Sequence, residues 1–569
     1  MTMRLTRWFN LIGAAMMAPA ALLAATLPAA AETSSEKAAA LLDGLIEAND
    51  PGLAVLAAQD GKILFEKGCG LADQEHHVPV IPQTTFLIGS VTKQFTASAI
   101  LKLQEEGKLS VNDKLSKYIP GFPRGNEVTL RQLLTHTSGI HNYNEDPGFF
   151  ERATNDTTEA FIEAMKKEPY DFDPGTKWSY VNSGYMVLGY IVAKVSGQSY
   201  GDFLRENFFQ PLGMTNTGVF RAQLALPHEA LGYSLGTNGF KPELNSDSSW
   251  AGGAGALYST VEDLYRWNEG IFNGRVLDKA SLKAAFTPVK MCEEQVNSDS
   301  GYGFGWSIKR YRKLPVIWHA GGVDGFRSIL LRLPGEAFTV TILANAGPGR
   351  TNAILEVLAA QLMNIYLADK LAPLPIVNTN VSSKSYDALT GRYDFIPPQL
   401  WRPYWGYILT ISRRGTQLFS QLGAGPEQEM FPKSKTEFFW KEGGDAGITF
   451  VKGSRGKAVK LIFYKDGIDM IAPRVKDITE AKVDPVVYDS LVGNYDYRNG
   501  QVLTVTRDGN HLFAQLKVQP KYEFFPKSET EYFGKVVDAQ VTFVKDATGK
   551  VTKAILHQGG QTIDVPKIQ

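Results

Sequence analysis

The chain has 569 residues, a length that favours more than one domain. Its 59 basic and 59 acidic side chains give a formal net charge of zero, and 44% of its residues are hydrophobic, enough for large cores. The balanced charge provides no basic surface for a polyanion. We therefore expect neither nucleic acid nor an anionic membrane surface as a partner.

The N-terminus has the pattern of a secretory signal peptide. Arg4 and Arg7 precede an apolar run from Leu11 to Leu27, and small residues follow at Ala29–Ala31. An uncleaved membrane anchor is the alternative, but the Ala-rich run ends in a cleavage pattern. We therefore expect residues 1–31 to be removed, leaving a periplasmic or secreted chain without a membrane span.

A helix and a hairpin are predicted next. Ala38 to Ala48 has the spacing of an amphipathic helix. Leu53–Ala58 and Lys62–Phe65 predict two strands that turn at Asp60-Gly61.

Cysteine and histidine usage predicts no metal site. Export permits a disulfide, but Cys69 and Cys292 are distant in the sequence and do not by themselves predict one. The eight histidines show no H-E-x-x-H spacing, and two cysteines are too few for a cysteine-based site. We expect neither a metal nor another cofactor.

Ser90 and Lys93 form a Ser-x-x-Lys box at the start of a long amphipathic helix. Apolar residues recur every four positions at Val91, Phe95, Ala99 and Leu103. Residues three apart share a helix face, so the Lys93 amine lies within reach of the Ser90 hydroxyl. A serine needs such a base, and burial makes a lysine amine neutral part of the time.

The box alone is a weak signal. Ser34/Lys37 and Ser454/Lys457 match the same pattern, although neither opens a long helix. An N-cap serine without catalytic function is the alternative interpretation of Ser90.

Two further stretches place polar side chains close together. His136 and Ser138 are close enough to suggest a triad, but Thr and Ser before Gly139 are typical of a hydrogen-bonded turn, which we predict. Tyr180-x-Asn182 precedes a buried helix from Gly184 to about Ser196. Tyr180 is a candidate proton relay, and a packing tyrosine is the alternative.

A glycine-rich stretch and a strand pair follow. Ala251–Gly255 is flexible enough to let backbone approach a ligand, but it lacks the lysine of a phosphate loop. Val261 to Phe272 predicts another amphipathic helix. Pro315 to Pro334 predicts strand, turn and strand, with His319-Ala320-Gly321-Gly322 where the first strand ends. The Gly322 N–H is a candidate oxyanion donor, and the glycines would let a substrate lie close to the strand.

The last third of the chain contains a repeat that follows a linker from Tyr366 to Ser385. Three segments recur: Tyr386–Asp394 as Tyr488–Asp496, Leu418–Leu422 as Leu512–Leu516, and Phe431–Phe439 as Phe525–Phe533. We expect two copies of one all-β module, at residues 386–476 and 488–569. Each copy is predicted to close as a small antiparallel barrel.

Three boxes in order carry a family resemblance: Ser90-x-x-Lys93, Tyr180-x-Asn182 and His319-x-Gly321. Together with LLTHTSGI and WHAGGVDGF, they resemble the penicillin-recognising serine hydrolases, which include class C β-lactamases, DD-peptidases, D-aminopeptidases and related esterases. The resemblance implies an α+β fold for residues 32–372: a β-lactamase-like antiparallel sheet flanked by helices, with an all-α subdomain. Two small all-β barrel-like modules would follow it.

The resemblance also implies roles for individual residues. The candidate catalytic residues are Ser90 as nucleophile, Lys93 and Tyr180 as general base and proton relay, and His319 where many members have lysine. The candidate substrate-binding residues are Asn182, Gly321, Gly322 and Arg327, with the N–H groups of Ser90 and Gly322 forming an oxyanion hole.

The leading hypothesis is an exported serine hydrolase acting through an acyl-enzyme on D-amino-acid peptides or amides, or on small esters. Its partner would be a small-molecule or short-peptide substrate. The chain has no K-T-G box, whose lysine would bind a substrate carboxylate, and histidine is mostly neutral at pH 7. Because Arg327 is a candidate for that charge, a β-lactamase or DD-peptidase stays open. A non-catalytic receptor for peptidoglycan fragments is the alternative from another class.

Overall fold

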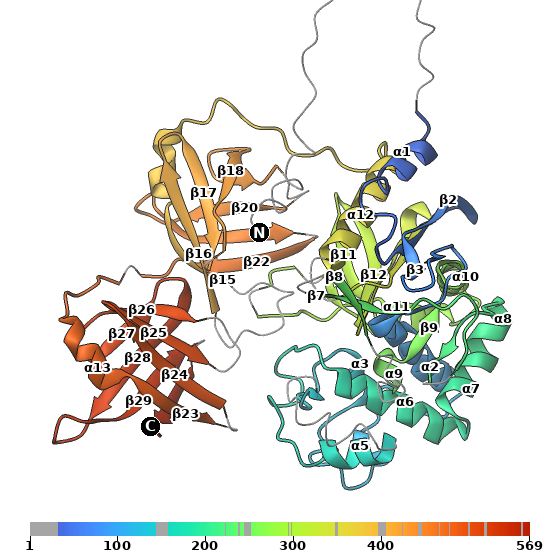
Figure 1. Cartoon of the computed structure of the whole chain (residues 1–569), viewed down its shortest axis with the longest axis horizontal. Helices are drawn as coiled ribbons and strands as arrows, with labels where there is room; N and C mark the ends of the chain where they lie inside the picture. The colour runs from blue at the N-terminus through green and yellow to red at the C-terminus, as the bar shows by residue number, and fades with distance from the viewer. Residues whose placement is uncertain are drawn as a thin grey trace, which may run out of the picture.

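A computed structural model describes residues 32–568, except 144–157, 222–223, 237–238, 244–251, 294, 298, 348–350, 396–405, 424, 442–445, 466, 477, 499–500, 517–520 and 559–560. The expected signal peptide thus lies outside the described residues. An N-terminal body built around one large sheet is followed by two β-modules (Figure 1). Within the described ranges, no helix has the length and apolar character needed to cross a bilayer.

The N-terminal body is built on a seven-stranded antiparallel sheet. Its order is β10 (Gly301–Tyr302), β11 (Ser307–Tyr311), β12 (Leu314–Val323), β13 (Phe326–Leu333), β14 (Phe338–Ala344), β1 (Leu53–Gln59) and β2 (Lys62–Cys69). The predicted hairpin is confirmed as β1–β2. Asp60 and Gly61 both have positive φ, 52° and 78°, as a tight two-residue turn between antiparallel strands requires.

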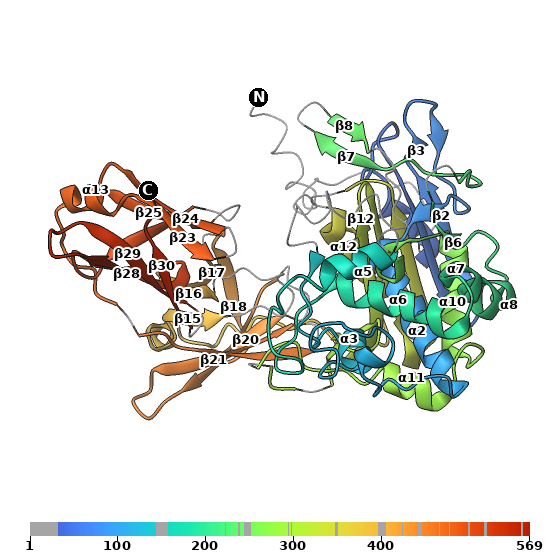
Figure 2. The same ribbon diagram turned by 90° about the horizontal axis from the view of Figure 1, so that it is seen from below.

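Helices cover both faces of this sheet (Figures 1 and 2). One face packs on α1 (Ser34–Ala40) and α12 (Thr351–Tyr366), and the other on α2 (Thr92–Glu105), α6 (Asn182–Ser196), α10 (Val261–Phe272) and α11 (Lys279–Ala285). Strand β1 is apolar from Leu53 to Ala58 because alternate residues enter opposite cores: Leu56 belongs to the core on the α2 and α10 side, whereas Val55 belongs to the core on the α12 side.

The first helix differs from its predicted extent. We predicted Ala38–Ala48, but α1 spans Ser34–Ala40. A capping box explains the early start, since the Thr33 hydroxyl accepts from the Glu36 N–H and the Glu36 carboxylate accepts from the Thr33 N–H at 2.7 Å. The chain then turns, and Gly44 adopts φ 76°.

Short elements complete the body on the α2 side. The helices are α3 (Leu130–Leu134), α5 (Thr158–Met165), α7 (Tyr200–Leu204), α8 (Gln210–Leu212) and α9 (Gly252–Gly255). The strands are β3 (Leu71–Asp73), β4 (Val78–Pro79), β5 (Phe86–Leu87), β6 (Gly218–Val219), β7 (Tyr233–Gly236), β8 (Gly239–Pro242) and β9 (Leu257–Ser259).

The C-terminal repeat forms two modules of eight strands each. Module 1 contains β15 (Gly391–Phe395), β16 (Gly406–Arg414), β17 (Gln417–Leu422), β18 (Gln428–Pro432), β19 (Glu437–Phe439), β20 (Gly447–Lys452), β21 (Ala458–Lys465) and β22 (Ile468–Pro473). Module 2 contains β23 (Gly493–Arg498), β24 (Gln501–Asp508), β25 (His511–Leu516), β26 (Tyr522–Pro526), β27 (Glu531–Gly534), β28 (Val537–Lys545), β29 (Val551–Gln558) and β30 (Gln561–Pro566).

Each module is a nearly closed barrel-like sheet around its own apolar core. The two ends of each sheet meet through a single bridge, Tyr393 to Arg474 in module 1 and Tyr495 to Lys567 in module 2. Strand β16 of module 1 also pairs with β28 of module 2, so the two sheets are hydrogen-bonded to each other.

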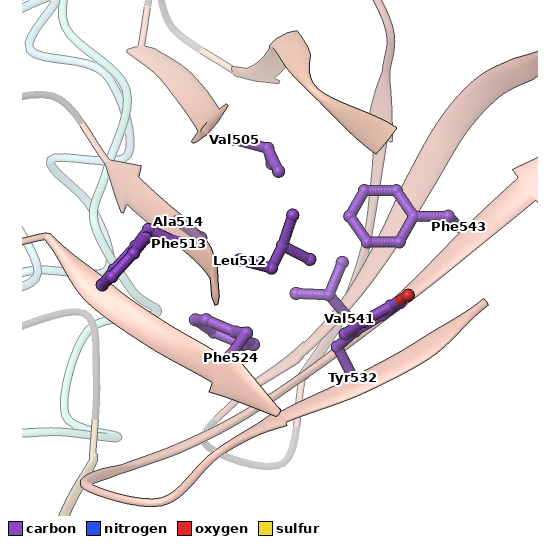
Figure 3. Close-up of a pocket in the computed structure, with 8 residues that line it drawn as sticks. All are labelled: Val505, Leu512, Phe513, Ala514, Phe524, Tyr532, Val541 and Phe543. Atoms are coloured by element: carbon purple, nitrogen blue, oxygen red, sulfur yellow. The ribbon is translucent and has the colours of Figure 1, made fainter. Parts of the chain in front are cut away.

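One pair of side chains distinguishes the two copies. In module 1 the Trp440 indole N–H donates to the Ser420 hydroxyl at 2.9 Å. The equivalent positions in module 2 are Gly534 and Ala514. Ala514 lines a small apolar pocket there, with the side chains of Leu512, Phe524 and their neighbours around it (Figure 3).

Candidate active site

Ser90 lies in a tight turn, Gly89–Val91, that leads directly into α2. Gly89 adopts φ 48°, and a Cβ added there would lie 2.7 Å from the Gly322 backbone nitrogen. Only glycine satisfies both the left-handed backbone and this close approach. The turn that carries Ser90 is therefore pressed against strand β12.

The Lys93 amine lies beneath Ser90 at the junction of three elements. Its Nζ is 3.0 Å from Ser90 Oγ, 2.7 Å from Asn182 Oδ1 and 2.8 Å from the Ala254 carbonyl oxygen. The side chain has 0% exposure, and this burial lowers the pKa of Lys93 well below its usual value.

The three contacts define how a neutral Lys93 amine would be oriented. A neutral amine has two N–H donors and one lone pair. The Asn182 and Ala254 oxygens can only accept, so they take the two N–H groups. The lone pair is left for Ser90, whose hydroxyl can donate. The geometry therefore favours proton transfer from Ser90 to Lys93.

Tyr180 lies beside this pair, two residues before the first residue of α6. The Lys93 Nζ is 4.9 Å from the centre of its ring. Burial raises the pKa of Tyr180 above its usual value, while a hydrogen bond with Ser90 acts in the opposite direction. Tyr180 is therefore a neutral phenol at physiological pH, able to donate a proton.

His136 contacts the same site, which the sequence did not predict. The predicted turn is present around it, with the Thr135 and Thr137 hydroxyls 2.9 Å apart, and His136 itself has φ 60°. The buried ring lies 4.3 Å from the Tyr180 ring, and its Nδ1 accepts from the Val181 N–H at 3.1 Å. No local signal predicts this contact, because the partners are more than 40 residues apart.

His319 is also oriented by a residue that the sequence analysis missed. The Tyr302 hydroxyl lies 2.8 Å from His319 Nε2, and His319 Nδ1 lies 2.6 Å from the Ala320 carbonyl oxygen. A carbonyl only accepts, so Nδ1 carries the proton and Nε2 accepts from Tyr302. Burial, and then the nearby Lys93, lower the pKa of His319 to about 3.

The two glycines of the His319 box have different surroundings. A Cβ at Gly321 would lie 2.0 Å from the Ile88 carbonyl oxygen, so this position lets β12 pack against the turn that carries Ser90 rather than against a substrate. Gly322 is exposed and pairs with Arg327 across β12–β13. The half-buried Arg327 guanidinium donates to the Val323 and Phe326 carbonyl oxygens.

The glycine-rich stretch before β9 lies close to the protein's own backbone. Residues Gly252–Gly255 form α9, and Ala251 lies outside the described residues. The Gly253 carbonyl oxygen accepts from Thr96 at 2.6 Å, and a Cβ at Gly189 of α6 would lie 2.9 Å from the Gly253 nitrogen. The stretch therefore packs closely against α6, and its Ala254 carbonyl oxygen accepts a hydrogen bond from Lys93.

Comparison with known families identifies the family to which this chain belongs. The model of the family described as Beta-lactamase matches residues 38–362, more than half of the chain. This chain belongs to the beta-lactamase family, a family of serine hydrolases. A second model, described as a domain of unknown function (DUF3471), matches residues 477–566, which contain module 2. Among the described residues, no cluster of histidine, cysteine and acidic side chains has the composition of a metal site.

Relatives in this family include penicillin-binding proteins. The chain is 29% identical to penicillin-binding protein 4* of Bacillus subtilis over 444 residues, covering 74% of this chain and 94% of that protein. It is 30% identical to protein flp of Staphylococcus aureus over 324 residues, 55% of this chain and 63% of flp. It also spans 61% of PbpX of Bacillus subtilis, at 35% identity over 44% of this chain.

Solved structures with the same fold include amide hydrolases. A D-stereospecific amidohydrolase from Streptomyces sp. aligns with TM-score 0.50 and 27% identity, over 57% of this chain and 98% of that one. A penicillin-binding protein from Bacillus halodurans aligns with TM-score 0.51 and 27% identity, over the same shares. The predicted β-lactamase-like fold of the N-terminal body is thus confirmed.

Proposed function

We propose that this chain is an exported serine hydrolase that acts through an acyl-enzyme on amides and short peptides of D-amino acids, or on small esters. The observation that carries the proposal is the 3.0 Å contact between Ser90 Oγ and the buried Lys93 Nζ, whose two N–H groups have other acceptors. The similarity to a D-stereospecific amidohydrolase supports the amide substrate.

Acylation follows from this arrangement. Ser90 Oγ attacks the substrate carbonyl carbon while its proton passes to Lys93 Nζ. The N–H groups of Ser90 and Gly322 stabilise the oxyanion, which Gly89 permits by bringing the two backbones together. As the C–N bond breaks, Tyr180 donates its proton to the leaving amine and regains one from the Lys93 ammonium. Asn182 keeps Lys93 in place and is the candidate partner for the substrate amide.

Deacylation uses the same groups in reverse. A water molecule attacks the ester carbon and gives its proton to the neutral Lys93. The proton then returns to Ser90 Oγ as the acid leaves. Because Lys93 Nζ lies 3.0 Å from Ser90 Oγ, it can take the proton in acylation and return it in deacylation, so the mechanism requires no further base.

The state of His319 supports substrates without a carboxylate at this position. A lysine would present a fixed positive charge to a carboxylate, but the depressed pKa of His319, about 3, keeps its imidazole neutral. Both ring nitrogens already have hydrogen-bond partners. An amide, an ester or an amino-terminal residue therefore fits beside the neutral His319 side chain better than a carboxylate does.

A β-lactamase or DD-peptidase activity is the second candidate. Similarity to penicillin-binding protein 4* along 94% of its length favours it, and Arg327 beside Gly322 is the candidate carboxylate partner. Nitrocefin turnover separates the two proposals. The second proposal would be established if the wild-type chain hydrolyses nitrocefin rapidly and Arg327→Ala abolishes this hydrolysis. The same variant should still hydrolyse a D-amino-acid p-nitroanilide.

Labelling with a reactive phosphonate ester tests the nucleophile without knowledge of the substrate. Intact-mass spectrometry should show one adduct on the wild-type chain and none on Ser90→Ala. Ser454→Ala is the matched control, because Ser454 and Lys457 share the Ser-x-x-Lys pattern but lie in a turn of module 1. An adduct that survives in Ser90→Ala would refute the proposal, and no adduct on either chain would favour the non-catalytic receptor.

A further inference from the structure

A short segment links module 1 to the wall of the candidate active site. It runs from Val289 to Tyr302, and we call its described residues the connecting segment. Its two ends are joined by backbone hydrogen bonds, Val289 N–H to Tyr302 O at 2.9 Å and Tyr302 N–H to Val289 O at 3.2 Å. The segment is therefore a closed loop with Tyr302 at its base.

Module 1 holds the tip of the connecting segment. The Val296 N–H donates to the Asp469 carbonyl at 2.8 Å, and the Asp469 N–H donates to Asn297 Oδ1 at 3.0 Å. Asn297 Nδ2 donates to the Gly467 carbonyl. The tip thus extends the edge of β22, the strand that reaches toward the N-terminal body in Figure 1.

A buried glutamine joins the tip of the connecting segment to its base by hydrogen bonds. Gln295 is 1% exposed, and its Nε2 donates to the Ser300 carbonyl at 2.6 Å and to the Asn297 carbonyl at 2.9 Å. Its Oε1 accepts from the Met291 N–H at 3.0 Å. A displacement of the tip therefore reaches Ser300, two residues before Tyr302.

Tyr302 ends the path inside the site. It is 2% exposed, and its hydroxyl donates to His319 Nε2 at 2.8 Å. Its ring lies 4.6 Å from the His136 ring and 6.1 Å from the Tyr180 ring. A change in the position of Tyr302 would disturb both the His319 orientation and the packing behind Tyr180.

We propose that module 1 supports the active site: by holding the connecting segment it places Tyr302, a positioning residue that fixes the orientation of the His319 ring, whose tautomer the Ala320 carbonyl already sets. Module 1 then contributes to the reaction through the connecting segment. The functional half of this inference rests on the proposed function, whereas the orientation of His319 does not.

The test uses the full-length chain with the substitution Asn297→Ala. Asn378→Ala is the matched control: Asn378 Oδ1 also accepts from a backbone N–H, and its Nδ2 donates to the Lys433 carbonyl of module 1, but it lies in the linker. Tyr302→Phe removes the hydroxyl itself. It keeps the test available if Asn297→Ala does not fold.

The first readout is the ¹⁵N spectrum of the histidine side chains, which needs no substrate. Wild type should show His319 protonated at Nδ1, with its Nε2 resonance shifted by an accepted hydrogen bond; His319→Gln assigns it. Tyr302→Phe should move that resonance, Asn297→Ala should move it less in the same direction, and Asn378→Ala should leave it in place.

The second readout is kinetic, on a D-amino-acid p-nitroanilide. We expect Asn297→Ala to lower kcat roughly 3- to 30-fold, with KM changed by less than about twofold. The inference would be overturned if the His319 resonance and kcat do not change in Asn297→Ala, or if they change by the same amount in Asn378→Ala. If the wild-type chain is inactive on every substrate but the His319 resonance moves as expected, the proposed function is refuted and the positioning of His319 by Tyr302 still stands.

Discussion

Replacing Lys93 by methionine tests the base directly. Lys93→Met keeps a long, flexible side chain in a site with 0% exposure but removes the amine that faces Ser90. An ordinary lysine is only about 0.04% neutral at pH 7, and each unit by which burial lowers the pKa raises that fraction tenfold. In the proposed mechanism, burial is what makes Lys93 usable as a base.

General-base catalysis contributes about 10²- to 10⁴-fold, or roughly 2.7–5.5 kcal/mol of barrier. We therefore expect kcat/KM and the rate of phosphonate labelling to fall by that factor in Lys93→Met. Gln94→Met is the matched control, because Gln94 is the next residue of α2, is equally buried, and accepts from the Trp267 indole at 3.1 Å instead. Its activity should stay within about twofold of wild type.

The pH dependence identifies the titrating group. The lowered pKa of Lys93 means that activity is present above that pKa and is lost as pH falls through it, by about one log unit per pH unit. Histidine is the rival, but the pKa of His319, about 3, places its titration in strong acid. A Lys93→Met variant within tenfold of wild type, with the same acid limb, would refute Lys93 as the base.

Two other substitutions test local geometry. Gly89→Ala brings a Cβ within 2.7 Å of the Gly322 nitrogen, so kcat should fall by at least about tenfold; Gly107→Ala, also at positive φ but with open space around it, should not change kcat. Ser420→Ala removes the acceptor of the half-buried Trp440 indole N–H, so calorimetry should show the transition of module 1 destabilised by about 0.5–1.5 kcal/mol, with kcat unaffected. An unchanged melting profile would show that this hydrogen bond contributes nothing to the module.

The sequence predicted the parts of the site that depend on local periodicity. Ser90 and Lys93 are three residues apart, in the Gly89–Val91 turn and the first turn of α2, so their contact follows from local spacing. Asn182 is 89 residues from Lys93, and only the family resemblance brought it to the same site. Tyr302 and His136 were missed because their contacts arise from packing between separate segments of the chain. Such packing produces no regular residue spacing from which the contacts could be predicted.

The repeat shows the same division between local and long-range information. Recurring segments such as Leu418–Leu422 predicted two copies of one module. The pairing of β16 with β28, and the bond between Asn297 and the Gly467 carbonyl, could not be predicted, because backbone pairing between separate units has no residue signature of its own. Helix α1 is a different case, because its early start depends on the Thr33/Glu36 capping box, a local pattern that the prediction overlooked.

Burial shifts each titratable group around Ser90 toward its neutral form. The pKa values of Lys93, His136 and His319 are lowered, and that of Tyr180 is raised. Burial thus disfavours a fixed charge on these four groups before the reaction, and the candidate for a fixed cation is Arg327 beside Gly322. In the proposed acylation, however, the Ser90 proton moves to Lys93, and a cation forms 3.0 Å from Ser90 Oγ in the step that creates the oxyanion. The opposite charges therefore arise together, and the attraction between them stabilises the transition state more than the bound substrate.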